Sequence, residues 1–387
     1  MIPAVIEDIN RYATDHRAAM IEFVEQLALA ESPSNVPEAQ EQVLAQMEEA
    51  LTDLDFHTIR VVGRNTGGYI YARPRVRTPD QPIQLLVGHC DTVWPLQTLP
   101  TMPVISNDQT IKGPGVYDMK GGLTQLIFAL KALKALSLKP SVAPVILINS
   151  DEEIGSKEST AAISRLARLA DRAYILEPSL DMDGKLKTGR KGVGRFYVEV
   201  QGQPAHAGLD PGKGANAIVE LSYLIQELFK MNDPEREISV NVGMVEGGIR
   251  PNVVAPFSSA VVDVRVPTQK DAQEVSSRIH ALKSENPLVE VRVKGNIGRQ
   301  PMEGTPANRR LWKKAKDTGE SLGIPLKEAF AGGASDGNTT SLYTATLDGL
   351  GATGDGAHAS HEFLYIDRMV ERTTLLVSLL MLEPVRI

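Results

Sequence analysis

Residues 85–122 read LLVGHCDTVWPLQTLPTMPVISNDQTIKGPGVYDMKGG, and this stretch decides how we expect the chain to fold. The apolar run 85–88 ends in glycine, which predicts a buried strand that reaches its end there. His89 and Asp91 follow, and side chains two apart on an extended chain point the same way. Asp118 comes later, between glycines that let backbone approach closely. One interpretation is that His89, Asp91 and Asp118 belong to a metal site. The alternative is a polar strand end followed by an acidic turn. Which of the two holds depends on whether the rest of the chain supplies further metal ligands.

Acidic side chains also follow two other apolar runs. The run 144–149 (PVILIN) leads to Glu152 and Glu153, and the run 173–176 leads to Glu177. Strands that alternate with helices predict an α/β fold with a mostly parallel central sheet flanked by helices. Ligands of such sheets bind beyond the carboxyl ends of the strands, which is where these side chains are expected.

The pattern changes near residue 189. Two glycine-rich connectors, 189–194 and 295–306, enclose a segment whose predicted order is strand, helix, strand, strand, helix, strand. This βαββαβ order is typical of a ferredoxin-like domain. We therefore expect an inserted domain over 190–301, within a larger domain formed by 1–189 and 302–387.

The composition excludes several classes of protein. The 387 residues are 42% hydrophobic and 23% charged, as in ordinary globular proteins. The net charge of −7 and the lack of a long basic run argue against a nucleic-acid partner. The first 30 residues predict an amphipathic helix rather than a signal peptide, and no apolar run approaches the roughly 20 residues that span a bilayer. A single cysteine, Cys90, excludes an intramolecular disulfide, so we expect a cytoplasmic protein. Because strand alternation directs Cys90 away from the face of His89, we expect its thiol to be packed in the core and not to bind metal.

A second imidazole comes from His358, in the late loop GDGAHASHE (354–362). Histidines together with carboxylates suit zinc or a similar first-row ion. Asp118, Glu153 and Glu177 would bring three negative charges, which one dication leaves poorly compensated in a buried site. Two dications together with a bridging hydroxide balance that charge, and a bridging carboxylate can hold both ions, so the count favours a paired-metal site.

Six motifs, in this order, resemble those of the M20 family of metallopeptidases and deacylases. They are His89-x-Asp91-Thr92-Val93, the stretch from Gly113 to Gly122, residues 151–156 (DEEIGS), Glu177-Pro178, Gly332-Gly333 with Ser335-Asp336, and Ala357-His358 with Glu362. The likeness covers nearly the whole chain and implies a zinc-peptidase-like domain that carries an inserted lid and dimerisation domain. HxDTV and the Glu-Pro pair resemble the glutamate carboxypeptidase branch most.

The resemblance implies a ligand set for two zinc ions, with cobalt or manganese as alternatives. His89 and Glu177 would bind one ion, Glu153 and His358 the other, and Asp118 would bridge them. His358 is preferred over His361 because the family places its histidine four residues before the glutamate that is Glu362 here.

The resemblance also implies supporting roles. Asp91 would orient His89, and a cis peptide would follow Asp118. Glu152 would be the general base that takes a proton from the metal-bound water and returns it to the departing amine.

The inserted domain would form a homodimer. His206, in the loop GQPAHAGLDPG (202–212), matches a histidine that reaches the partner's active site and stabilises the oxyanion. Asn252, Arg265 and Gly333 match substrate-binding positions. The guanidinium of Arg265 can bind a substrate carboxylate through two hydrogen bonds. A pair of Arg265 with Asp263 on the strand face is an alternative of equal weight. Without the resemblance, His206 would be interpreted as a histidine of a surface loop.

The predicted function is two-zinc hydrolysis of an amide bond next to a free carboxylate, in a small peptide or N-acyl amino acid. Carboxypeptidase action comes first, and deacylation of the acetylornithine or succinyl-diaminopimelate type is the alternative. A serine hydrolase is a remote rival, since Gly333-Ala334-Ser335-Asp336-Gly337 satisfies GxSxG, but an apolar strand does not precede it. The other rival is a binding module without catalytic activity, which should have lost the general base or a metal ligand. Glu152 and all five ligand positions are present, which argues against it.

Overall fold

The structure is a computed structural model that describes residues 3–385. The chain divides into two compact units. Unit 1 comprises the described residues up to Gly189, Gly304–Ala331 and those from Ser335 onward. Unit 2 comprises Arg190–Glu303 together with Gly332–Ala334. Each unit is described by itself below.

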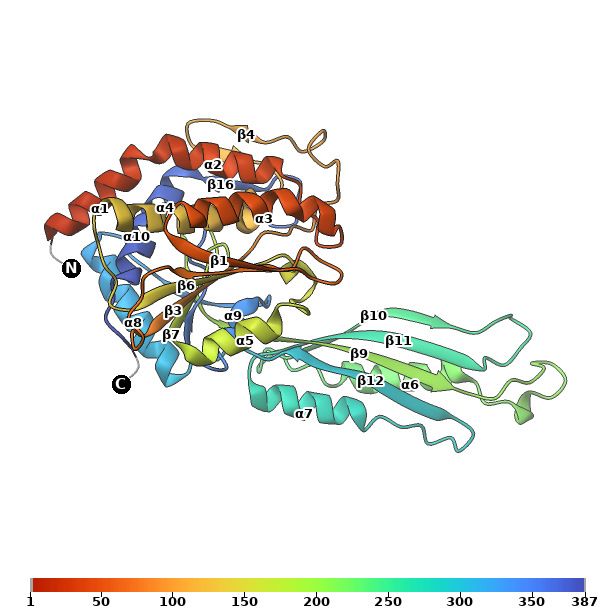
Figure 1. Ribbon diagram of the computed structural model, residues 1–387. Coiled ribbons are helices and arrows are strands. Elements are labelled where there is room, and N and C mark those ends of the chain that lie inside the picture. The colour runs from red at the N-terminus through yellow and green to blue at the C-terminus, as the bar shows by residue number, and fades with distance from the viewer. Residues whose placement is uncertain (1–2, 386–387) are drawn as a thin grey trace. The chain divides into compact units, whose positions relative to one another are not determined.

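The centre of unit 1 is a six-stranded sheet with the order β1-β2-β6-β3-β7-β14 (Figure 1). The strands β6, β3, β7 and β14 are parallel, and β1 and β2 form an antiparallel edge. Their bounds are β1 Phe56–Val61, β2 Tyr69–Pro74, β3 Ile83–His89, β6 Ala143–Asn149, β7 Ala170–Ile175 and β14 Ala345–Leu347. Every residue of β3, β6 and β7 is buried, as expected for strands covered on both faces. The predicted mostly parallel sheet is confirmed.

Alternate residues of β3 enter two different cores. Leu86 packs with the apolar side chains of α1 to α4, α8 and α10, whereas Leu85 and Val87 pack with those of α5. Helices therefore cover both faces of the sheet. Their bounds are α1 Pro3–Asp15, α2 Arg17–Leu29, α3 Pro37–Thr52, α4 Gly121–Ala135, α5 Thr160–Leu169, α8 Pro306–Ser321, α9 Asp336–Thr340 and α10 Ile366–Leu380.

Two features of unit 1 differ from expectation. The amphipathic helix predicted over the first 30 residues is two helices, α1 and α2, which are separated at His16 (φ −99°, ψ 11°), and residues 1 and 2 lie outside the described part. A small four-stranded sheet, β15-β16-β5-β4, was not predicted, because its strands are too short to show a period. Their bounds are β4 Ile105–Ser106, β5 Thr110–Lys112, β15 Gly354–Asp355 and β16 Phe363–Tyr365.

Unit 2 has the predicted βαββαβ order, with an antiparallel sheet β10-β11-β9-β12 (Figure 1). Buried residues alternate along β9 and β11, and the buried side packs against α6 and α7. The bounds are β9 Gly192–Gln201, α6 Ala217–Phe229, β10 Ser239–Gly247, β11 Phe257–Val266, α7 Gln269–His280 and β12 Glu290–Arg299. In unit 1, a two-stranded sheet pairs β8 (Leu186–Arg190, of which the last residue is assigned to unit 2) with β13 (Glu328–Ala331).

Among the residues described, none of the helices combines the length and the apolar character that crossing a membrane requires.

Candidate metal centre

Three parallel neighbours, β3, β6 and β7, deliver the first group of candidate residues to one edge of the sheet. His89 is the last residue of β3 and pairs with Asn149 at the end of β6. Glu152 and Glu153 lie in a single 3₁₀ turn just after β6, and Glu177 follows β7. Because parallel strands end at the same edge, residues far apart in the sequence meet there.

Asp118 reaches this edge from a turn held by Glu362. Inside the π-helical turn Val116–Lys120, Asp118 departs from helical geometry (φ −114°, ψ 93°), and its bond to Met119 is cis. The buried Glu362 carboxylate accepts hydrogen bonds from the backbone N–H groups of Gly115, Tyr117 and Asp118, at 3.0, 3.0 and 3.1 Å. This role of Glu362 was not predicted, because nothing in the sequence indicates that the loop around it folds back on residues 115–118.

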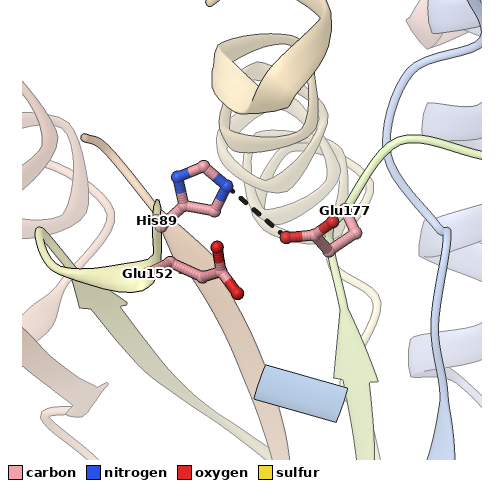
Figure 2. Close-up of side chains that lie close together, drawn as sticks. All are labelled: His89, Glu152 and Glu177. Atoms are coloured by element: carbon pink, nitrogen blue, oxygen red, sulfur yellow. Dashed lines mark ion pairs between the residues drawn. The ribbon is translucent and has the colours of Figure 1, made fainter. Parts of the chain in front are cut away.

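The carboxylate of Asp118 lies between the two histidines. Its Oδ1 is 3.2 Å from Nε2 of His89, and its Oδ2 is 3.6 Å from Nε2 of His358. Each histidine also meets a second carboxylate. Nε2 of His89 is 3.4 Å from Oε1 of Glu177 (Figure 2), and Nε2 of His358 is 3.0 Å from Oε2 of Glu153. The result is two sets of candidate metal ligands that share Asp118, one with His89 and Glu177 and one with His358 and Glu153.

Glu152 faces the same space as these ligands. Figure 2 shows its carboxylate beside the His89 imidazole and the Glu177 carboxylate. The ligand atoms of these three residues lie within 4.8 Å of one another, and so do those of His89, Asp118 and Glu153. Within residues 3–385, these are the groups of three or more that could hold a metal ion, and both contain His89.

Asp91 connects His89 to the turn that carries the two glutamates. Nδ1 of His89 is 3.0 Å from the backbone oxygen of Asp91 and 3.4 Å from its Oδ1. The same carboxylate accepts hydrogen bonds from the backbone N–H groups of Glu152 and Glu153, both at 3.2 Å, and from Oγ of Ser34 at 2.7 Å. Asp91 therefore orients the imidazole mainly through its carbonyl, and its side chain positions the glutamates.

A second buried network supports the 151–159 turn and was not predicted. Asp336 accepts hydrogen bonds from Oγ of Ser156 at 2.5 Å and from Nδ2 of Asn149 at 2.8 Å. Asp151 accepts from Oγ of Ser159 at 2.6 Å and from the backbone N–H of Glu158 at 2.7 Å. The motif residues Asp151 and Asp336 thus fix the backbone that presents Glu152 and Glu153.

The electrostatics of the cluster reflect its crowded carboxylates. Burial alone would lower the pKa of His89, but its contacts with Asp118, Asp91 and Glu177 raise that pKa well above its ordinary value. The Glu153 carboxylate raises the pKa of His358 to about 9. Burial raises the pKa of Glu153 to about 8, although His358 opposes this shift. Positive charge placed among these groups is therefore strongly stabilised.

The donor set fits a pair of dications. Two imidazole nitrogens and three carboxylates are the ligands that zinc and similar first-row ions take from proteins. Asp118 directs a separate oxygen toward each histidine, which is what a bridging carboxylate must do. Cys90 is fully buried in the core, and burial raises the pKa of its thiol to about 12. That agrees with a packed thiol rather than a thiolate ligand.

Ser335 is not placed as a nucleophile. It is fully buried and caps helix α9, where its Oγ accepts from the backbone N–H of Gly337. The same hydroxyl donates to Oδ2 of Asp348 at 2.6 Å. His358 instead contacts Asp118 and Glu153, so the triad of the serine-hydrolase alternative is not assembled among the described residues.

His206 and Asn252 lie together at one end of the sheet of unit 2. Both are exposed, and the backbone N–H of Ala207 donates to the carbonyl of Asn252 at 3.1 Å. Nδ1 of His206 accepts from the backbone N–H groups of Gly208 and Leu209, each at 3.1 Å. The neutral imidazole therefore carries its proton on Nε2, where it can be donated to a ligand.

Arg265 lies near the other end of that sheet, opposite Val193. A strand rises about 3.3 Å per residue, so Arg265 is roughly 26 Å along β11 from Phe257, where the strand begins. Its guanidinium pairs bidentately with Asp263, at 2.8 and 3.2 Å, as the alternative interpretation expected. Gly333 is exposed, and its carbonyl accepts from Nη1 of Arg190 at 3.1 Å.

Comparison with known proteins relates the chain to peptidases. Residues 188–288 match the family model of the M20 peptidase dimerisation domain. Carboxypeptidase G2 of Pseudomonas sp. (strain RS-16) is 28% identical over 95% of this chain and 90% of its own length. Succinyl-diaminopimelate desuccinylase of Delftia acidovorans is 25% identical over 77% of this chain and 80% of its own length.

A solved structure shares the fold. The Bacillus subtilis YXEP protein, described as a dinuclear metal-binding peptidase of the M20 family, superposes with a TM-score of 0.69 at 13% identity, covering 95% of this chain and 98% of that one. The matched dimerisation domain, the likeness to carboxypeptidase G2 along nearly the whole chain and this fold agree with the motifs at the strand ends. Residues 188–288 therefore match an M20 peptidase dimerisation domain, and the chain as a whole is similar to M20 peptidases in sequence and in fold.

Proposed function

We propose that this protein uses two dications, zinc foremost and cobalt or manganese as alternatives, to hydrolyse an amide bond next to a free carboxylate. The substrate is a small peptide or an N-acyl amino acid. The observation that carries the proposal is the position of Asp118 between His89 and His358, each of which contacts a further carboxylate.

Two overlapping sets of side chains would hold the ions. His89, Asp118 and Glu177 form the first set, and His358, Asp118 and Glu153 form the second. When bound, such ions polarise the scissile carbonyl and lower the pKa of water toward about 7. The dinuclear character described for the YXEP protein supports two ions rather than one.

Glu152 is the general base of this proposal. Its carboxylate lies within 4.8 Å of the ligand atoms of His89 and Glu177, so it can take a proton from a water that enters the cluster. The protonated Glu152 then donates that proton to the nitrogen of the departing amine. Asp91 keeps the carboxylate in place through the backbone N–H of Glu152.

The free carboxylate would be recognised by residues of unit 2. Arg265 and the pair His206 and Asn252 lie near opposite ends of one sheet, so a single small substrate cannot contact both groups of one chain. A homodimer resolves this, because Arg265 of one protomer and His206 of its partner can then serve one site. His206 carries its proton on Nε2, as required to stabilise an oxyanion.

The surface of unit 2 supports the homodimer. Strand β10 is an edge of its sheet, and α6, which packs beside it, exposes Ile218, Tyr223 and Phe229. An edge strand beside exposed apolar side chains is a surface that pairs with a second copy. The match to a dimerisation domain covers these residues.

Carboxypeptidase action is the first candidate, because the likeness to carboxypeptidase G2 extends over nearly the whole chain. Deacylation of an acylamino acid is the second, and it is favoured by the likeness to a succinyl-diaminopimelate desuccinylase over 77% of the chain. Both reactions cleave an amide near a carboxylate, so they differ in the groups on either side of that bond.

The test is hydrolysis by the zinc-loaded protein of N-benzoyl-glutamate, N-acetyl-ornithine, N-succinyl-diaminopimelate and alanyl-glutamate, with amine release as the measurement. We expect the glutamate substrates to be cleaved, a chelator to abolish the activity and zinc to restore it. N-benzoyl-isoglutamine lacks the free α-carboxylate and should be cleaved at least about a hundredfold more slowly. Equal rates for the acid and the amide would overturn the proposal.

A further inference from the structure

Arg372, on helix α10, is a charged side chain in the interior of unit 1, and only 2% of it is exposed. Within residues 3–385, the hydrogen bonds of its guanidinium all go to backbone carbonyls. Nε donates to Gly351 at 2.5 Å, Nη1 donates to Gly184 at 3.1 Å, and Nη2 donates to Gly349. Burying a charge is unfavourable unless strong hydrogen bonds compensate it, so these three carbonyls indicate what the arginine stabilises.

The three carbonyls belong to two separate turns of the chain. Gly184 and Gly349 have φ values of 72° and 78°, in the left-handed region that favours glycine. Burial lowers the pKa of Arg372 to about 10, so the guanidinium is still charged at neutral pH. A charged, planar donor forms strong hydrogen bonds of fixed geometry, so Arg372 fixes these two turns relative to each other.

The first of these turns lies against the backbone that carries Glu177. The backbone N–H of Gly351 donates to the carbonyl of Glu177 at 2.8 Å, just past the end of the parallel contact between β14 and β7. A Cβ at position 351 would lie only 2.1 Å from the carbonyl oxygen of Leu176. Because the two segments are this close, a shift of residues 349–351 must also move the backbone of Glu177.

The second turn follows Glu177 in the chain. Leu180 and Lys185 donate a backbone hydrogen bond to each other, both at 2.9 Å, and Gly184 lies in the turn that they close. Arg372 therefore binds the segment beside Glu177 and the turn that comes after it.

The second ligand set is held by other contacts. Between Gly351 and His358, the pairing of β15 with β16 fixes the chain. The carboxylate of Asp91 accepts a hydrogen bond from the backbone N–H of Glu153 at 3.2 Å. A disturbance at Arg372 should therefore reach the first ligand set and leave the second set largely intact.

We propose that Arg372 is a positioning residue for one of the two ions, because it fixes the chain on both sides of Glu177 and so directs that carboxylate toward His89 (Figure 2). The inference rests on the proposed function, which assigns Glu177, His89 and Asp118 to one ion. A lysine at position 372 would keep the positive charge. Its single ammonium cannot reproduce the planar fork that reaches three carbonyls.

The test measures zinc affinity, by competition with a chelator, in two backgrounds that each keep one complete ligand set. Glu153→Gln keeps the set that contains His89 and Glu177, and Glu177→Gln keeps the set that contains His358 and Glu153. In the Glu153→Gln background, Arg372→Lys should lower zinc affinity about 10- to 100-fold. In the Glu177→Gln background, it should change zinc affinity by less than about threefold, because the carboxylate that Arg372 positions is already gone.

Arg172→Lys is the matched control. Arg172 is fully buried in β7, and it also donates to backbone carbonyls, those of Leu382 and Glu383, at 2.7 and 3.0 Å. Both lysine substitutions should lower the melting temperature, but Arg172→Lys should leave zinc affinity unchanged in both backgrounds. A general loss of stability is thereby separated from positioning.

Two further measurements keep the inference testable if a variant folds poorly. In the otherwise native chain, native mass spectrometry should show one zinc ion retained by Arg372→Lys at a zinc concentration that fills both sites of the unmodified protein. Gly184→Ala keeps the guanidinium but strains the turn that presents one of its carbonyls. It should lower zinc affinity about three- to tenfold in the Glu153→Gln background alone.

The outcomes separate this inference from the proposed function. Native zinc affinity in Arg372→Lys, equal losses in the two backgrounds, or a loss matched by Arg172→Lys overturns the positioning role and leaves the function standing. A loss confined to the Glu153→Gln background supports the positioning role. If the unmodified protein binds no zinc, both the inference and the proposed function are overturned.

Discussion

The buried carboxylate of Glu362 accepts a hydrogen bond from the backbone N–H of Asp118 at 3.1 Å, so the residue proposed to bridge two ions is held by an acid 244 positions away. Trp94 donates to the same carboxylate at 2.9 Å. In Glu362→Gln, an amide NH₂ would face these N–H donors. We expect a lower melting temperature and a zinc affinity reduced about 10- to 100-fold, measured by competition with a chelator.

A control separates positioning from general loss of stability. Val377→Ala removes buried volume from α10 and should lower the melting temperature without changing zinc affinity. If Glu362→Gln and Val377→Ala reduce zinc affinity equally, Glu362 has no specific role at the metal centre.

Glu152 and Glu153 are adjacent in sequence but have different proposed roles. Glu152→Gln should retain the zinc content of the unmodified protein and lower kcat by about 10²- to 10⁴-fold, because the proton acceptor is lost. Glu153→Gln should instead lower the zinc content, because it removes a contact of His358. Elemental analysis beside steady-state kinetics measures both. Full turnover by Glu152→Gln would rule out its role as the base.

His206 is proposed to act on the partner's site, and subunit mixing tests this directly. His206→Ala and Glu152→Gln should each be nearly inactive alone. In a mixed dimer, one site regains both native residues if His206 acts in trans, so random mixing should restore about a quarter of the native activity. A mixture as inactive as its components would show that His206 acts within its own chain or not at all.

The homodimer is expected to depend on the exposed apolar side chains of α6. Tyr223 is 58% exposed in the chain, and Tyr223→Asp would place a charge in the proposed interface. We expect this variant to be a monomer by light scattering coupled to gel filtration, whereas Val76→Asp remains a dimer. A dimeric Tyr223→Asp would exclude this surface.

Glu31 fixes the outer end of the 92–99 loop, and its effect should depend on pH. Burial would raise the pKa of its carboxyl, but hydrogen bonds from the backbone N–H groups of Gln97 and Leu99, at 2.8 and 3.0 Å, hold that pKa below its ordinary value. A lowered pKa in the folded state stabilises the protein above the unfolded value of about 4.3, and this contribution is lost as pH falls through the folded value.

Urea titrations of the native protein and of Glu31→Gln measure this contribution. At pH 7 the variant should be less stable by about 1 kcal/mol in free energy of unfolding. The difference should shrink as the pH falls below about 4. A difference that stays constant from pH 7 to pH 3 would mean that the charge of Glu31 is not what holds the loop.

The parallel sheet could be predicted from the sequence because its buried strands are continuous apolar runs. Residues 85–87 and 145–148 are entirely apolar, and each run leads directly to His89 or to the Glu152 turn. A strand end that is followed by a residue of a metal-binding type is a local signal, so most of the candidate metal ligands could also be proposed from the sequence. The roles assigned to these residues stay predictions until metal and activity are measured.

Other features depend on contacts between distant residues and leave no local signal. The contact of Glu362 with residues 115–118 is one such feature, because it joins segments separated by most of the chain.

The measurement that tests the central claim most directly is the number of zinc ions bound per chain, determined by native mass spectrometry of the unmodified protein and of Asp118→Ala. We predict two ions per chain in the unmodified protein and the loss of both in Asp118→Ala, because Asp118 contacts the histidines of both ligand sets. A single ion in the unmodified protein, or two ions retained by Asp118→Ala, would contradict the account.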